Sequence, residues 1–302
     1  MGPNSILLMH AQKAAFGGGN LAAEPASIRG AETIPQQRLY QEHYERLGDL
    51  YREMTTWSQA AVGFFGSDDP KDAAEYQAKA HAAYDVLLGL HVATDIVTPG
   101  VCTLEKLSRY ELVVLPDLRF LTDEHLDALR IFHAGGRRLL VFGDREDCTG
   151  QVRETSENPL ARLSEGPLDP EIIRRTVADM TDEIRPLLHL PASVDRKHAV
   201  AIKAAAWVDD PAGPSRVIVH LVNFNVDPEA DEYRVARVKA GLVTVPFPDS
   251  DTTCRVIRVD DRREERVSAV VDDDHVRTEV TDLGIHTIVV FKRDHPGDDA
   301  IG

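Results

Sequence analysis

The sequence predicts an α/β domain built on a parallel sheet, followed by an antiparallel β-sandwich. Over residues 59 to about 150, apolar runs of strand length alternate with segments of helix length, the pattern of parallel strands joined by crossover helices. From Ala199 onward the hydrophobic period becomes two, and turns recur at short intervals, as in sandwiches. With 302 residues the chain is long enough for both domains.

The first segment, residues 1–58, fits neither pattern. Ser5–Phe16 and Pro35–Trp57 are predicted helices, separated by a loop rich in Ala, Pro and Gly. Two helices and a loop cannot bury a sizeable core alone, so this segment must pack on something else. We therefore divide the chain into residues 1–58, 59–192 and 193–302.

The predicted α/β domain offers one place for a ligand. In such sheets a crevice forms at the carboxyl ends of the strands, where Asp68, Asp117, Arg119 and Asp144 lie in the sequence. The elements expected in order are strand Ala60–Phe65, helix Asp72–Leu90, strands Ala93–Val97 and Glu111–Leu115, a helix from Thr122 to His133, strand Arg138–Phe142 and helix Asp169–Arg185.

Eight strands are predicted for the sandwich. Acidic and Pro/Gly-rich turns separate them, and the tail from His295 onward is expected to be disordered. The strands are Ala199–Val208, Arg216–Asn225, Arg234–Lys239, Leu242–Val245, Cys254–Val259, Arg266–Val271, Val276–Val280 and Ile285–Lys292.

Charge and composition limit the partners. The net charge of −16 argues against nucleic acid and anionic membranes, and no apolar run reaches the length of a membrane helix. We expect a cytoplasmic protein; its acidity fits either a high-salt cytoplasm or an ordinary acidic protein from a GC-rich genome. Cys102, Cys148 and Cys254 are odd in number and widely spaced, which argues against a disulfide framework or a zinc site.

Three kinds of chemistry are not supported by the residue pattern. An amidotransferase needs a nucleophilic Cys directly after a central strand, but Arg138–Phe142 runs into Gly143-Asp144, and Cys148 has no recognisable base. The loop Gly66–Pro70 carries two carboxylates, which would repel a nucleotide or flavin phosphate. Asp272–His275 is more typical of a solvated turn than of a metal site, so we expect neither cofactor nor metal. His220, inside an apolar strand, is interpreted as a structural histidine whose hydrogen bonds are satisfied.

Several phrases resemble family 42-type β-galactosidases and related glycosidases. The resemblance lies in the middle domain of these proteins, often called the trimerisation domain, and in the sandwich that follows it. The middle domain implies a flavodoxin or amidotransferase-like fold. The matching phrases are Ala83–Leu88, Tyr110–Pro116, Leu121–Glu124, Gly135–Gly143, Val219–Asn225 and Asp282–Val290.

The resemblance covers only the non-catalytic portion of that family. Its members carry both catalytic glutamates on a (β/α)8 barrel, of which residues 1–58 resemble the final part. No catalytic residue can be carried over, and Asn20 and Glu24 are the nearest positions that would line a sugar pocket. The resemblance implies a homo-oligomer, a trimer in that family, and carbohydrate as a ligand.

Three hypotheses remain open: a non-catalytic accessory or oligomerisation module, an active glycoside hydrolase whose barrel is a separate chain, and an amidotransferase-like ligand-binding domain.

Overall fold

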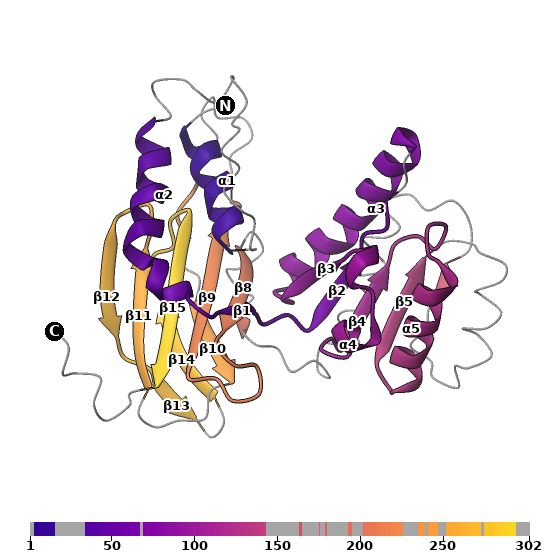
Figure 1. The fold of residues 1–302 in the computed structure, drawn as a ribbon. Helices are drawn as coiled ribbons and strands as arrows, with labels where there is room; N and C mark the ends of the chain where they lie inside the picture. The colour runs from indigo at the N-terminus through magenta and orange to yellow at the C-terminus, as the bar shows by residue number, and fades with distance from the viewer. Residues whose placement is uncertain are drawn as a thin grey trace. The chain divides into compact units, whose positions relative to one another are not determined.

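The computed structural model describes residues 3–15, 34–66, 69–142, 163–164, 175, 179, 193–194, 202–225, 235–238, 241–246, 252–272 and 275–293. They belong to two compact units (Figure 1). Residues 58–189 contain the first, called the α/β unit, and residues 1–57 with 190–302 contain the second, called the sandwich unit. None of the helices in the described ranges is long and apolar enough to cross a membrane.

A five-stranded sheet forms the centre of the α/β unit. Its strand order is β3-β2-β4-β5-β6, and every neighbouring pair is parallel. In chain order this is 2-1-3-4-5, the flavodoxin-like arrangement. The parallel sheet predicted from the alternating pattern is therefore confirmed. The elements are β2 (Ala60–Gly63), α3 (Pro70–Gly89), β3 (Thr94–Val97), η4 (Pro99–Val101), α4 (Leu104–Leu107), β4 (Leu112–Leu115), α5 (Asp123–Ala134), β5 (Arg138–Phe142) and β6 (Leu163–Ser164).

Local sequence signals set the helix ends of this unit. Asp69 caps α3 by accepting the backbone N–H of Lys71 at 2.8 Å. Thr122 and His125 cap α5 reciprocally, and Gly136, at φ +85°, takes a left-handed conformation just after that helix ends. All four residues of β2 and of β4 are buried, as expected for central strands covered on both faces.

The sandwich unit contains two antiparallel sheets. The larger has the order β1-β8-β9-β15-β11-β12 and the smaller β13-β14-β10-β7. Its elements are α1 (Pro3–Ala15), α2 (Ile34–Leu47), η3 (Gly48–Tyr51), β1 (Thr55–Thr56), β7 (Ser193–Val194), β8 (Ile202–Val208), β9 (Arg216–Asn223), β10 (Gly241–Pro246), β11 (Thr252–Arg258), β12 (Arg263–Val267), β13 (Val270–Asp272), β14 (His275–Val280) and β15 (His286–Arg293).

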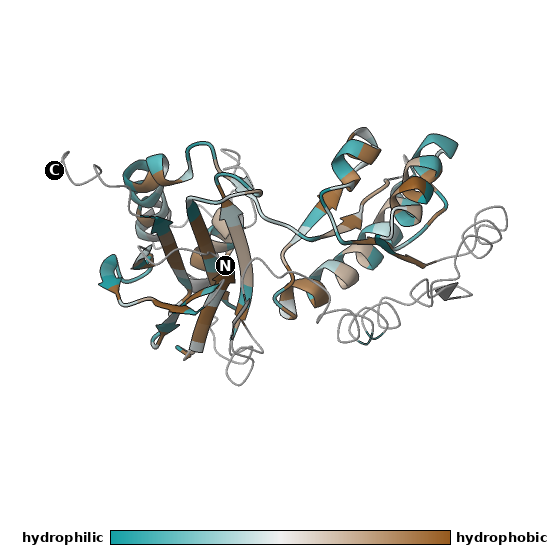
Figure 2. Ribbon diagram, turned by 90° about the horizontal axis from the view of Figure 1, so that it is seen from below, coloured by the Kyte–Doolittle hydropathy of each residue, from teal (hydrophilic) through white to brown (hydrophobic). Residues whose placement is uncertain are grey.

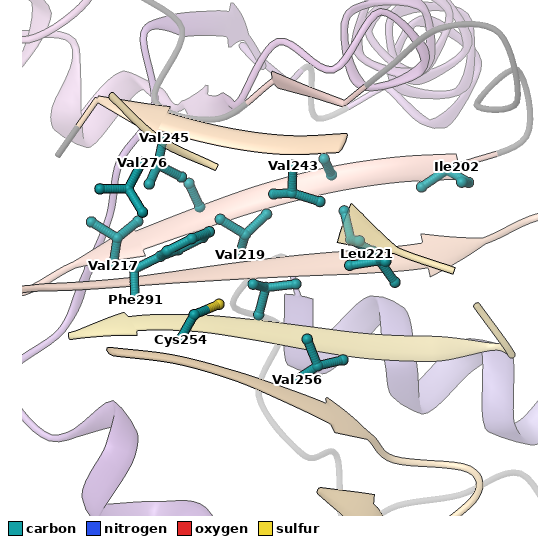
Figure 3. Packing of buried hydrophobic residues seen from close by; sticks show 14 of the residues in the cluster. Ile202, Val217, Val219, Leu221, Val243, Val245, Cys254, Val256, Val276 and Phe291 are labelled. Atoms are coloured by element: carbon teal, nitrogen blue, oxygen red, sulfur yellow. The ribbon is translucent and has the colours of Figure 1, made fainter. Parts of the chain in front are cut away.

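The core of this unit lies between the two sheets. Val219 and Phe291 from the larger sheet meet Val243 and Val276 from the smaller one (Figure 3), and all four are fully buried. Hydrophobic residues follow the strands of both units, whereas hydrophilic residues occupy the exposed sides of the helices (Figure 2). Burial of this apolar surface is the main force that holds the sheets together.

The N-terminal helices cover the other face of the larger sheet. Tyr40 and Leu47 of α2, with Ala11 and Ala15 of α1, pack on buried residues of β9 and β15 such as Ile218. The segment that could not bury a core alone therefore completes the sandwich unit as a third layer. The barrel origin expected from the resemblance is not confirmed by this packing.

The second predicted helix is shorter than its pattern suggested. It ends at Leu47, continues as η3 to Tyr51, and the chain then becomes extended so that β1 pairs with β8. Gly48 follows the last helical residue, and Glu53 has a φ of 63°. A left-handed residue at that place is incompatible with a continuing helix.

Two of the predicted strands differ in the structure. Within Arg234–Lys239, the described residues 235–238 form isolated bridges, such as that from Val238 to Leu283, and no continuous strand. The predicted strand Arg266–Val271 is divided between β12 and β13, which belong to different sheets. Of the predicted helix Asp169–Arg185, only residues 175 and 179 are described, and both are helical.

Candidate functional site

The carboxyl end of the parallel sheet contains the two predicted site residues that the structure describes. Asp117 and Arg119 follow β4, and they contact each other: Arg119 Nε donates to both carboxylate oxygens of Asp117, at 3.1 and 2.9 Å. The other four predicted residues, Asn20, Glu24, Asp68 and Asp144, lie outside the described residues.

A lysine that the sequence analysis did not single out completes this group. Lys79 of α3 is buried and donates to Asp117 at 3.0 Å and to Glu75 at 2.7 Å. Arg119 also reaches Glu75 at 3.2 Å and Asp72 at 3.6 Å. Lys79 is one helical turn after Glu75, a spacing that predicts an ion pair between these two residues. The spacing does not predict that Lys79 also contacts Asp117, which follows β4. We call these five residues the Asp117 network.

The electrostatics of the network keep Asp117 ionised. Burial would raise the pKa of Asp117, but hydrogen bonds from the side chain and backbone of Arg119 and from Lys79 outweigh burial and hold that pKa below its ordinary value. The hydrogen bond and charge of Lys79 also lower the pKa of Glu75. A general acid needs a pKa near the working pH, so these carboxylates are unsuited to donate a proton to a substrate.

Aromatic rings lie beside the network in the described part of this strand edge. The Tyr76 hydroxyl donates to the carbonyl of Gly63 at 3.1 Å, and its ring lies 5.8 Å from those of Phe64 and Phe120. A Cβ on Gly63 would come within 2.8 Å of Leu115. The strand-order reversal between β2 and β4 is where a flavodoxin-like sheet binds its ligand. Among the described residues, Phe64, Tyr76 and Phe120 lie near this position, and the Asp117 network links α3 to the loop after β4.

The two described thiols do not provide a nucleophile. Cys102 and Cys254 are both buried and free. Burial raises the pKa of Cys102 to about 11 and that of Cys254 to about 12, so both remain protonated at neutral pH. Reactive cysteines have lowered pKa values, because the thiolate is the attacking species. Cys148, weighed above as an amidotransferase nucleophile, lies outside the described residues.

A second polar group, in the sandwich unit, emerged only from the structure. It lies between the N-terminal helices and the larger sheet, and we call it the histidine–tyrosine cluster. Tyr40 Oη lies 3.1 Å from His286 Nδ1, and His286 Nε2 lies 3.0 Å from His220 Nδ1. Its members are Tyr40, His43, Tyr51, His220 and His286.

The histidines of this cluster are held neutral. Burial lowers the pKa of His220 to about 3 and, together with the charge of Arg46, lowers that of His43 to about 4. Burial and its histidine neighbours also depress the pKa of His286. His220, interpreted from the sequence as a satisfied structural histidine, is fully buried, but among the described residues its Nε2 has no hydrogen-bond partner. Neutral imidazoles are good metal ligands, but no group of three metal-binding side chains occurs among the described residues.

Comparison with solved structures adds evidence on the fold. An α-L-fucosidase, isoenzyme 2 from Paenibacillus thiaminolyticus, matches 97% of this chain with a TM-score of 0.63 and 14% identity. Gan42B, a GH42 β-galactosidase from G. stearothermophilus, also matches 97% of it, with a TM-score of 0.52 and 12% identity. The chain spans 58% and 51% of the lengths of these two proteins. At such identities the likeness is one of fold.

No protein-family model matches the sequence, and the search among curated proteins finds no relative.

Proposed function

We propose that this chain is a non-catalytic accessory or oligomerisation portion of a glycoside hydrolase-like protein. The observation that carries the proposal is the shared fold. Two glycoside hydrolases contain an arrangement that matches 97% of this chain, while the chain spans only 58% and 51% of their lengths. The remainder of each of these two proteins, which this chain does not match, is long enough to contain a catalytic domain. The sequence phrases that resemble family 42-type β-galactosidases favour the same assignment.

The chemistry of the described residues supports a non-catalytic role. Glycoside hydrolysis generally needs two carboxyl groups facing one sugar, about 5 to 10 Å apart, and one of them needs a raised pKa. The best-placed carboxylate at the parallel sheet, Asp117, has a lowered pKa and is bound by Lys79 and Arg119. Such a residue stabilises a loop and is not available to protonate a glycosidic oxygen.

A hydrolysis assay tests this proposal. The purified chain is incubated with nitrophenyl β-D-galactoside and nitrophenyl α-L-fucoside, and release of nitrophenol is followed by absorbance. We expect no rate above the background. Turnover that disappears when one internal carboxylate is replaced by its amide would contradict the proposal, whereas turnover that survives every such substitution would indicate a contaminating enzyme.

A second candidate follows from the same partial coverage. The catalytic domain of an active glycoside hydrolase would then be a separate chain that binds this one. A neighbouring reading frame that encodes barrel strands would favour it, and mixing both purified chains should restore hydrolysis. Sedimentation of the chain alone would measure the oligomeric state, for which the resemblance implies a trimer.

A further inference from the structure

A pocket in the sandwich unit is rich in cationic side chains, although the protein as a whole is acidic. It lies beside the end of α2 and has a volume of about 500 Å³. Among the described residues that line it, five are cationic and one, Asp49, is acidic, although the whole chain has a net charge of −16. We call it the cationic pocket. The five cations are Arg46 from α2, Arg216 from β9, Arg255 from β11, Arg266 from β12 and Lys292 from β15.

Strand register brings four of these cations onto one face of the larger sheet. Arg216 is directly opposite Lys292, and Arg255 is directly opposite Arg266. Their strands are neighbours in the order β9-β15-β11-β12. Lys292 is opposite Thr253, two residues before Arg255, so the row consists of two pairs offset along the strands, and it spans roughly 14 Å across the four strands. Like charges directly opposite each other destabilise a sheet, so an anion bound in this row would relieve a repulsion that the fold itself creates.

One described acid, Glu264, contacts two of the cations that line the pocket. Glu264 lies 2.8 Å from Arg255 and 3.6 Å from Arg46. Asp49 contacts Arg52, which is outside the pocket lining. Arg216 donates through its Nη2 to the Arg52 carbonyl at 3.1 Å, which holds its guanidinium beside the pocket.

From this register and charge, we propose that the cationic pocket binds an anionic oligosaccharide, a short sugar chain that bears carboxylate or sulfate groups. Guanidinium groups donate two parallel hydrogen bonds to such groups, and a row of them suits a ligand with several charges. None of the described residues that line the pocket is aromatic, so a stacking platform for bases is missing there. The choice of a sugar rests on the proposed function, whereas the anionic character rests on the pocket alone.

Calorimetric titration of the full chain with trigalacturonate tests the proposal. We expect saturable binding at low salt, weakening as salt screens the charges, and no binding of the neutral trisaccharide maltotriose. Arg255→Gln combined with Arg266→Gln should weaken binding about tenfold, the effect of two partly exposed ion pairs. The matched control, Arg109→Gln with Arg130→Gln in the α/β unit, removes the same charge and should change affinity less than twofold.

The outcomes separate this proposal from the previous one. Absence of trigalacturonate binding at millimolar concentration, equal binding of maltotriose, or equal loss in the control variant would overturn it. Equally tight binding of a single-stranded oligonucleotide of the same charge, or full competition by equimolar inorganic sulfate, would also overturn the oligosaccharide assignment. The double variant loses the Arg255–Glu264 ion pair as well as the like-charge pair with Arg266, so a cooperative thermal transition is used to verify that it folds. Binding is measured without turnover, so the result stands whether or not the chain hydrolyses glycosides.

Discussion

Mild acid should destabilise the sandwich unit at a pH at which most carboxylates are still ionised. The perturbation is a change from pH 7.5 to pH 5, which acts on the histidine–tyrosine cluster. In the unfolded chain a histidine has a pKa near 6.5. In the folded chain the pKa of His43 is about 4 and that of His220 about 3. The folded state therefore excludes protons that the unfolded state binds.

The sign and the size follow from linkage. A lowered folded pKa gives stability that is fully present above pH 6.5 and is lost as the pH falls toward the folded pKa. At pH 5, which is 1.5 pH units below 6.5, each of these two histidines costs roughly 2 kcal/mol. Their sum, roughly 4 kcal/mol, is a large fraction of the stability of a typical domain. His286 has a depressed pKa as well and acts in the same direction.

Urea titrations followed by tryptophan fluorescence measure this loss. Both tryptophans, Trp57 and Trp207, belong to the sandwich unit, so the signal reports that unit. Trp207 donates to the Ala15 carbonyl at 2.8 Å and therefore also senses the docking of α1. We expect the urea midpoint to fall steeply between pH 6.5 and 5.

A matched pair of variants identifies the source of the pH dependence. His43→Gln removes one buried imidazole. Between pH 6.5 and 5, the free energy of unfolding should then depend less steeply on pH, by the equivalent of about one bound proton. His275→Gln removes an exposed histidine of the same unit and should retain the slope. The reasoning is refuted by a free energy of unfolding that changes by less than about 1 kcal/mol between pH 7.5 and 5.

Three further substitutions test the packing. Lys79→Met leaves the buried Asp117 without one of its cations and should destabilise the α/β unit by about 3 kcal/mol in thermal unfolding followed by circular dichroism. Gly284→Ala would bring a Cβ within 2.0 Å of Asp260, which accepts backbone N–H groups there, and should cost about 1 to 3 kcal/mol in urea unfolding. Phe291→Ala empties the space between the two sheets and should cost about 3 to 5 kcal/mol; an unchanged urea midpoint would contradict the core assignment.

Local patterns predicted much of the α/β unit. The strands β2, β4 and β5 follow from short apolar runs, and Thr122 and Gly136 mark the limits of α5 through capping and a left-handed turn. These signals are local because hydrogen-bonding partners lie within a few residues. The crevice residues were harder to predict. Sequence order placed Asp117 and Arg119 at the correct edge, but it gave no sign that Lys79 and aromatic rings would occupy the space beside them.

By itself, the sequence determined the α/β-plus-sandwich class and the parallel orientation of the strands in the first sheet, because hydrophobic period and helix caps act over a few residues. Only the tertiary structure decided what the N-terminal helices cover and which side chains meet across strands. His220 and His286 are 66 residues apart and join through neighbouring strands. Arg255 and Arg266 become a like-charge pair only through register. Pairing between strands that are distant in the sequence depends on the total apolar surface buried on both faces of the sheet. No short sequence motif specifies that total.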